Sequence, residues 1–280
     1  MFRFFKKLFG QSSPIIPVVR LQGMIAASSG ARRGLSMAIV APLLEKAFRI
    51  KAAPAVAIII NSPGGSPVQS SLIFQRIRQL SKETNTPVLA FVEDVAASGG
   101  YWLACAGDEI YVNAASVIGS IGVVSAGFGF EGAIEKLGVT RRVYTAGKRK
   151  VMLDPFQPEN EADIAHLKSL QQEIHDQFIG MVKSCRGTKL NGDDDLLFSG
   201  AFWTGQKAIE LGLADKEGEL RTILKSRFGD KVEIKLIEPK RSLLGMSAGA
   251  NGVTAHFAEA SIDHLIDVAE EKSARSRFGL

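Results

Sequence analysis

The sequence predicts an α/β protein built on a parallel sheet with flanking helices. Two apolar runs of strand length, 55–61 and 87–92, are rich in β-branched or other apolar residues, which is typical of strands covered on both faces. Helical patterns at 35–50 and 66–82 alternate with these runs through short connections. Strand–helix–strand repeats of this kind form parallel sheets with right-handed crossovers.

The chain is long enough to bury a large core. It has 280 residues, of which 46% are hydrophobic and 22% charged, and this balance excludes a disordered chain or a collagen-like fibre. No repeat of 20–50 residues is present, which argues against a solenoid.

The first half of the chain contains the clearest strand and helix boundaries. A first strand is expected at 15–26, and Ser66 followed by Pro67 is a typical helix start, with serine as N-cap and proline at the first helical position. A glycine- and alanine-rich helix begins within 97–106. Further short strands are predicted at 109–113, 121–126 and 141–145.

The second half is predicted to be mainly helical. A long helix at 159–185 carries one apolar stripe with steps of three or four residues: Ile164, Leu167, Leu170, Ile174, Phe178 and Met181. Smaller helices at 204–211 and 217–227, a strand near 232–237 and an amphipathic helix at 254–275 follow. We therefore divide the chain into a basic N-terminal segment (1–14), a main domain (15–237), and a linker with a helical C-terminal tail (238–280).

Charge and cysteine content narrow the choice of partners. Six of the 34 basic residues and none of the 29 acidic ones lie in residues 1–34, so the remainder carries a net charge of −1. A basic terminus on a neutral body argues against a nucleic-acid partner. Cys105 and Cys185 form neither a disulfide framework nor a zinc motif, and we expect no cofactor or metal.

The N-terminal segment alternates aromatic and basic residues. Residues 1–9 (MFRFFKKLF) lack the apolar core of a secretory signal, and no stretch of the chain has the apolar length of a spanning helix. The segment fits a peripheral contact with an anionic membrane surface, or equally a frayed terminus. We expect a cytoplasmic protein that contacts the inner face of the membrane at most peripherally.

Two glycine-containing turns follow buried strands, at 61–65 (NSPGG) and 96–100 (AASGG). Each leaves backbone N–H groups free at a helix start, which attracts an anion or a developing oxyanion. Neighbouring parallel strands bring such turns together at the carboxyl edge of the sheet, where ligands bind. Tight turns of this kind also commonly connect strands to helices without a functional role. Neither turn matches a phosphate-binding loop.

Ser98, in the second turn, is a candidate nucleophile, although a simple helix N-cap is the commoner role of such a serine. The four histidines, His166, His175, His256 and His264, lie on the long helix or in the tail, which disfavours a Ser–His pair. A largely neutral lysine is the other available base, and Lys150, next to Val151 and Met152, enters an apolar patch. A solvated basic loop explains the same residues.

Several separate motifs together resemble the SppA-type signal peptide peptidases, which are serine–lysine peptidases with a ClpP/crotonase-like fold. The resemblance runs through 58–71 (IIINSPGGSPVQSS), 92–123, 144–156 (YTAGKRKVMLDPF) and 198–215, in the same order. It implies a serine endopeptidase that hydrolyses signal-peptide remnants or unfolded and membrane-derived peptides, working as a homo-oligomer.

The resemblance also implies roles for individual residues. Ser98 matches the nucleophile, Lys150 the general base and Ser120 the serine that orients the lysine, while the backbone N–H groups of Gly65 and Gly99 match the oxyanion hole. The chain is about half the length of tandem-domain members, so both dyad residues must come from its single domain. We do not expect the transmembrane anchor of many members, because no stretch of the sequence has the apolar length of a spanning helix.

Two other functions compete with the peptidase. A crotonase-type acyl-CoA hydratase or isomerase would use the same pair of amides with carboxylates as acid and base, but Glu93 and Asp94 form no spaced pair with another acid. A catalytically degenerate, membrane-associated scaffold is the other alternative, against which the intact Ser98 and Lys150 argue.

Overall fold

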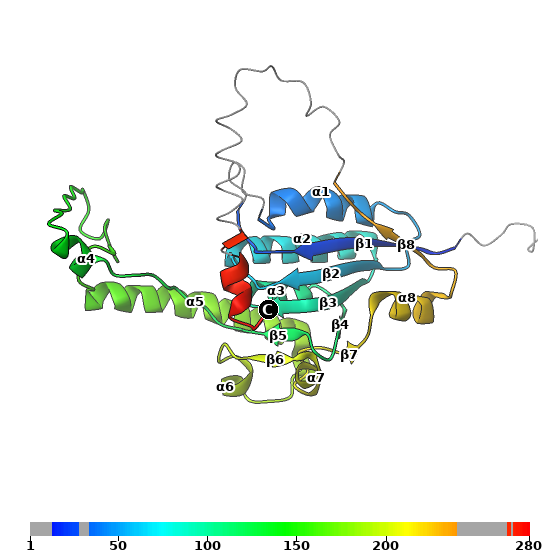
Figure 1. Cartoon of the computed structure of the whole chain (residues 1–280). Coiled ribbons are helices and arrows are strands. Elements are labelled where there is room, and N and C mark those ends of the chain that lie inside the picture. Colours follow the sequence, from blue (N-terminus) through cyan, green and yellow to red (C-terminus); the bar gives the residue numbers. More distant parts are fainter. Residues whose placement is uncertain (1–12, 28–33, 240–267, 270) are drawn as a thin grey trace, which may run out of the picture.

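The computed structural model describes residues 13–27, 34–239, 268–269 and 271–280, and its centre is one mixed sheet between two layers of helices (Figure 1). The strand order is β6-β5-β3-β2-β1-β8, with β4 paired to β3 and β7 paired to β4. The strands are β1 (Ile15–Gln22), β2 (Val56–Ser62), β3 (Val88–Ala97), β4 (Glu109–Val112), β5 (Val117–Gly119), β6 (Phe202–Thr204), β7 (Lys216–Glu217) and β8 (Glu233–Leu236).

Strand β3 organises the sheet because it pairs with three neighbours. It runs parallel to β2 along most of its length, to β4 over Leu89–Phe91 and to β5 over Val95–Ala97. The pairing of β5 with β6 is antiparallel, whereas the other described pairings are parallel. The predicted parallel α/β architecture is therefore confirmed, and β2, β3 and β5 all end at one edge of the sheet.

Alternate residues of the central strands enter two separate cores. Ile58 and Ile60 of β2 pack under the helices of one face, whereas Ala57 and Ile59 face the other. The first core is covered by α1 (Met37–Phe48), α2 (Pro67–Thr84), α3 (Gly99–Ala104), part of α5 (Glu161–Arg186) and α7 (Gly205–Glu210). The second lies under α8 (Leu220–Phe228). A short helix, α6 (Asp194–Leu197), precedes β6.

The helix boundaries follow the predicted capping. The Ser66 hydroxyl accepts a hydrogen bond from the Gln69 N–H, Pro67 is the first residue of α2, and Asn85 ends the helix in the left-handed conformation. This N-cap prediction is confirmed. No helix among the described residues has the length and apolarity needed to cross a bilayer.

Two predicted strands are wrong. Strand β5 ends at Gly119, and the positive φ angles of Gly119 and Ser120 turn the chain before 121–126 can continue the sheet. Residues 141–145 are irregular because they lie away from any sheet edge, and a strand needs a partner. Most of the predicted helix at 254–275 lies outside the described residues, although 271–276 are helical.

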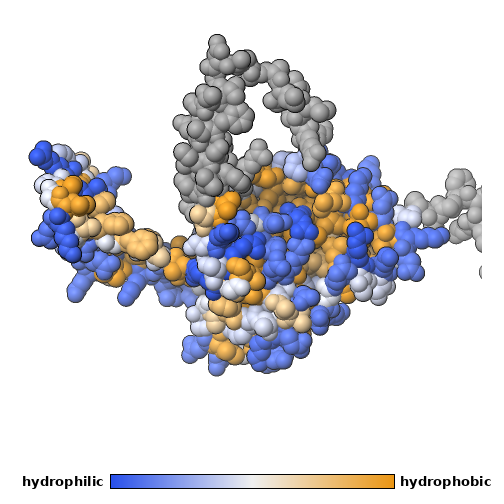
Figure 2. Space-filling model, viewed as in Figure 1, coloured by the Kyte–Doolittle hydropathy of each residue, from blue (hydrophilic) through white to orange (hydrophobic). Residues whose placement is uncertain are grey.

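A long projection, the arm (residues 124–170), leaves the body of the protein beside β5 (Figure 1). It contains α4 (Glu131–Lys136), an irregular loop and the first ten residues of α5. Its far end is held by the Arg141–Asp154 ion pair, with 2.8 Å between Arg141 Nε and Asp154 Oδ2. Large apolar side chains on the arm are exposed, including Phe128, Leu137 and Tyr144 at 80%, 75% and 90%, and Figure 2 shows apolar surface along it.

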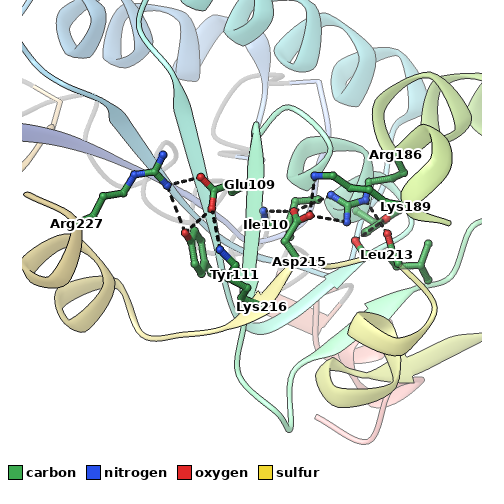
Figure 3. Close-up of polar contacts among 11 residues, drawn as sticks. Glu109, Ile110, Tyr111, Arg186, Lys189, Leu213, Asp215, Lys216 and Arg227 are labelled. Carbon is green, nitrogen blue, oxygen red and sulfur yellow. Dashed lines mark hydrogen bonds and ion pairs between the residues drawn. The ribbon is translucent and has the colours of Figure 1, made fainter. Parts of the chain in front are cut away.

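A buried ion pair fastens the other end of α5 to the sheet (Figure 3). Arg186 donates two hydrogen bonds to the Asp215 carboxylate, at 2.8 and 3.1 Å, and its Nε donates to the Gly212 carbonyl. Asp215 also accepts from Lys189 Nζ and from the Ile110 N–H. Burial alone would raise the pKa of Asp215, but these hydrogen bonds outweigh it and lower the pKa to about 2.

We expect Asp215→Asn to lower the free energy of unfolding by about 3–5 kcal/mol, because it leaves the buried Arg186 charge unpaired. The folded pKa of Asp215 lies below its unfolded value of about 3.9, so the carboxylate stabilises the protein fully above about pH 4 and loses this effect as pH falls toward 2. Urea unfolding at pH 7 and at pH 3 measures both effects.

The matched control is Glu109→Gln, which removes the carboxylate that pairs with Arg227 (Figure 3). The Glu109 side chain is more exposed than that of Asp215, at 25% against 12%. We expect it to lower the free energy of unfolding by less than about 1 kcal/mol, since exposed pairs contribute little. Equal effects of the two variants would contradict the role assigned to Asp215.

Candidate active site

A cavity of about 590 Å³ opens at the edge of the sheet where β2, β3 and β5 end. Its walls come from the turns after these strands, from Trp102 of α3, from the middle of α5 and from the C-terminal segment. The turn after β2 contributes Gly64 and Gly65, and the turn after β3 contributes Ser98 and Gly99. The sheet therefore brings together the two glycine turns that the sequence predicted to meet.

The two turns pack backbone against backbone with no space for side chains. A Cβ on Gly64 would lie 2.8 Å from the Ala97 carbonyl oxygen and 2.8 Å from Ser98 Cβ. A Cβ on Gly100 would overlap the Ser62 backbone, and one on Gly65 would overlap Ile25. Gly64 and Gly65 also have φ angles of 104° and 137°, which L side chains rarely adopt. Glycine is therefore required here by geometry.

Ser98 has a strained backbone at the sharp turn from β3 into α3, with φ 52° and ψ −122°. Positive φ is uncommon for a residue with a side chain, and such strain concentrates at functional sites. The Ser98 N–H donates to the Gly119 carbonyl at 2.8 Å, while its carbonyl accepts from Tyr101 and Trp102. Its side chain makes no N-cap hydrogen bond, and the residue lines the cavity.

This conformation resembles the strained strand-to-helix elbow that exposes the nucleophile of α/β-hydrolases, although the local sequence differs from G-x-S-x-G.

Two backbone donors lie next to Ser98. The N–H groups of Gly65 and Gly99 donate no hydrogen bond within the described part of the chain, and both residues line the cavity. The Gly65 nitrogen lies 3.4 Å from the position that a Cβ of Gly99 would occupy, so the two residues are neighbours. Unused N–H groups beside a hydroxyl can stabilise negative charge on an oxygen bound between them.

Ser120 also lines the cavity, as the residue after β5. It has a φ of 53°, and its N–H donates to the Ala201 carbonyl at 2.7 Å. The hydrogen bond from Ser98 to Gly119 connects the two serine-bearing turns. One cavity therefore brings together most of the predicted site residues: Ser98, Ser120, Gly65 and Gly99.

Lys150 does not reach this cavity in the single chain. It is exposed on the arm, in the loop that precedes α5. The cavity contacts α5 at Ile174, His175 and Phe178, and at 1.5 Å per residue Glu161 lies roughly 20 Å further along the helix axis. The structure thus separates Ser98 and Lys150 within one copy.

The cavity contains one histidine that sequence reasoning set aside. His175 projects from α5, and its Nε2 lies 3.0 Å from the Ile121 carbonyl oxygen, so Nε2–H donates to that carbonyl. The sequence places His175 on the predicted long helix, but only the packing of α5 against the segment after β5 brings it into the cavity that Ser98 lines.

The described lining of the cavity includes no carboxylate. Glu93 pairs with Arg20, and Asp94 accepts a hydrogen bond from Asn61 at 2.7 Å; both lie outside the cavity. Within the described residues, no group of three or more His, Cys, Asp or Glu side chains is arranged to bind a metal. The lining therefore offers hydroxyls, backbone donors, an imidazole and the guanidinium of Arg277.

An α/β protein with a strained, partly exposed serine that lines a cavity beside two free amides has the site of a serine hydrolase. The profile of peptidase family S49 matches residues 81–232, more than half of the chain. This protein belongs to peptidase family S49, a family of serine peptidases, and the SppA-type resemblance is confirmed.

Curated relatives agree with this assignment. A Synechocystis protein with a protease name, slr0021, is 30% identical over 248 residues, covering 86% of each chain. An Enterococcus faecium protein with a signal-peptide-peptidase name is 30% identical over 207 residues, covering 73% of this chain and 60% of its own.

A Brucella abortus protein named Na(+)/H(+) antiporter NhaA is 56% identical over 272 residues. The match covers 95% of this chain but 37% of that protein, so the chain spans little more than a third of this relative's length.

We expect Gly65→Ala to lower the free energy of unfolding by at least about 2 kcal/mol and to reduce activity, because the added methyl group overlaps the Ile25 backbone and requires a disfavoured φ. Thermal unfolding and peptide hydrolysis measure the two effects.

The control is Gly132→Ala in α4, where nothing lies within 4 Å of the added Cβ. Alanine has the higher helix propensity, so we expect stability to be unchanged or up to about 1 kcal/mol higher. A Gly65→Ala protein as stable and active as this control would contradict the close packing of Gly65 on Ile25.

Proposed function

We propose that this protein is a serine endopeptidase in which Ser98 attacks the substrate carbonyl and Lys150 is the general base. The observation that carries the proposal is the strained Ser98, whose hydroxyl has no capping partner, beside the two unused amides of Gly65 and Gly99. Membership of a serine peptidase family supports the same chemistry.

The proposed reaction is acyl transfer. The neutral Lys150 amine takes the Ser98 proton as the serine oxygen bonds to the peptide carbonyl carbon, and the Gly65 and Gly99 amides stabilise the oxyanion. The C–N bond then breaks and the lysine ammonium protonates the leaving amine. Water, deprotonated by the same amine, attacks the acyl-enzyme and releases the carboxylate and Ser98. Ser120 orients the lysine.

We further propose that Lys150 acts on Ser98 of a second copy of the chain, in a homo-oligomer. Within one copy the two residues are separated along α5, and the arm that carries Lys150 exposes large apolar side chains over much of its length. Apolar surface of this extent is typical of an interface. Inserting the arm into a neighbour's cavity would remove water from the lysine, which favours the neutral amine that a base requires.

The substrates we propose are signal-peptide remnants or unfolded and membrane-derived peptides. The relative with a signal-peptide-peptidase name supports the first class. An open cavity at the end of a sheet, lined by backbone and apolar groups, suits an extended peptide. Peripheral contact with the inner face of the membrane through residues 1–9, and a cytoplasmic location, are parts of the proposal that lie outside the described residues.

The geometry favours this function over its alternatives. A crotonase-type hydratase needs carboxylates as acid and base, and the described cavity lining contains none. A non-catalytic scaffold has no need for a strained serine, which costs about 1–3 kcal/mol.

Ser98→Ala and Lys150→Ala should each reduce peptide hydrolysis by at least about a thousandfold while the proteins stay folded, since one loses the nucleophile and the other the base. An equimolar mixture, reassembled after dissociation, should regain about a quarter of the wild-type rate, because random assembly places an intact Ser98 beside an intact Lys150 in a quarter of sites.

Both inactive variants must match the wild type in circular dichroism and in oligomer mass by light scattering. Activity of Ser98→Ala above trace level would refute the nucleophile. A mixture as inactive as its components would refute the supply of Lys150 by a second copy, and leave a dyad within one copy.

We expect His175→Gln to retain activity within about tenfold, because His175 donates to the Ile121 carbonyl and a glutamine amide can do the same. The rate should rise with pH above neutrality as the fraction of neutral lysine grows. A loss of more than about a hundredfold, or a rate that levels off above pH 7 in the wild type, would identify His175 as the base instead. Steady-state hydrolysis of one fluorogenic peptide from pH 5 to 10 gives both results.

A further inference from the structure

The C-terminal segment (residues 271–280) forms part of the cavity wall, although it lies more than 170 residues from Ser98 in sequence. Residues 271–276 are helical and 277–279 form a turn. Ala274, Arg277 and Phe278 line the same cavity as Ser98. In Figure 1 this segment, in red, crosses the body of the protein next to α3 and β5.

Arg275 anchors the segment to the sheet. It donates to the Asn61 side-chain oxygen at 3.1 Å and to the Asn61 carbonyl at 3.3 Å, and its own side chain is 17% exposed. Asn61 in turn donates to Asp94 and stands directly before the turn that contains Gly65. Glu271 pairs with Arg275 at 2.9 Å, which holds the guanidinium in place.

A second anchor lies on the other side of the cavity. The Phe278 ring packs edge-on against Phe202 of β6, with ring centroids 5.0 Å apart. The segment is therefore fixed at β2 through Arg275 and at β6 through Phe278. Residues between these anchors, including Arg277, are held at the mouth of the cavity.

Arg277 is the one Lys, Arg, Asp or Glu side chain among the described residues of the cavity lining. It is exposed, and the described part of the chain gives it no ion-pair or hydrogen-bond partner. Arg275, two residues earlier, is by contrast fully engaged with Asn61 and Glu271. A guanidinium without an acidic neighbour, beside a cavity without carboxylates, is suited to an anionic group of the ligand.

We propose that Arg277 determines specificity by binding a carboxylate of the peptide substrate, either a free C-terminus or an Asp or Glu side chain. The proposal rests on the proposed peptidase function. A cavity of about 590 Å³ holds several residues of an extended peptide, so a carboxylate a few residues from the scissile bond can reach the rim while the bond lies at Ser98. The C-terminal segment thereby becomes part of the substrate site.

The test uses the full chain and one fluorogenic peptide in four forms: free acid or amide at the C-terminus, and Glu or Gln at one position after the scissile bond. In the wild type, at least one carboxylate form should have a KM about threefold to tenfold below that of its neutral counterpart, with added salt reducing the difference. Arg277→Gln should remove the difference through KM. Whichever pair discriminates identifies the source of the carboxylate.

Lys272→Gln is the matched control, because Lys272 is an exposed cation on the same helix that does not line the cavity. It should retain the wild-type discrimination. Arg275→Gln, which releases the anchor, should lose the discrimination as Arg277→Gln does. No discrimination in the wild type, or unchanged discrimination in Arg277→Gln, would overturn the proposal.

A binding measurement separates this proposal from the proposed function. Fluorescence anisotropy of the labelled peptides on Ser98→Ala reads carboxylate preference without cleavage. If the wild type hydrolyses no peptide but carboxylate forms still bind more tightly through Arg277, the peptidase function fails and the binding site stands. If the wild type hydrolyses the peptides with no effect of Arg277 on KM or binding, the specificity proposal alone fails.

Discussion

The site depends on one steric constraint: the turns after β2 and β3 interlock with only backbone between them. Parallel pairing of the two strands brings their ends to the same edge, and Gly64 and Gly100 let the turns approach more closely than any side chain would allow. This approach holds Ser98 in its strained conformation and aligns the amides of Gly65 and Gly99 beside it. A methyl group at Gly64 would overlap Ser98 Cβ and the Gly99 nitrogen, and would push the serine turn away from the β2 turn.

Strain at Ser98 is tolerable because the surrounding backbone is fixed from three directions. Its N–H is bound by Gly119, its carbonyl is bound by α3, and the β3 residues before it are buried between two helix layers. The same hydrogen bond to Gly119 positions Ser120, so the geometry of β5 follows from that of β3. The ion pair of Arg186 with Asp215 then holds α5 across this edge and places His175 and Phe178 on the cavity wall.

Local patterns in the sequence predict the parts of the site that local forces determine. The apolar runs identify β2 and β3, the Ser66–Pro67 pair identifies the start of α2, and clustered glycines identify the two turns. The stripe predicted α5, including its part in the arm, but no pattern predicted β5 or the arm before α5. A three-residue strand has too few residues to show a period, and the exposed loop of the arm has no core to impose one. The C-terminal anchor of Arg275 on Asn61 joins residues 214 positions apart, and no local pattern reports such a contact.

The central claim is that Ser98 is the nucleophile, and intact-mass analysis after treatment with a serine-reactive phosphonate tests it most directly. We expect one adduct per chain in the wild type, mapped by peptide digestion to Ser98, and none in Ser98→Ala. We also expect labelling to abolish hydrolysis in proportion to the adduct formed. An active protein that acquires no adduct, or one whose adduct maps to another residue and persists in Ser98→Ala, would show that Ser98 is not the nucleophile.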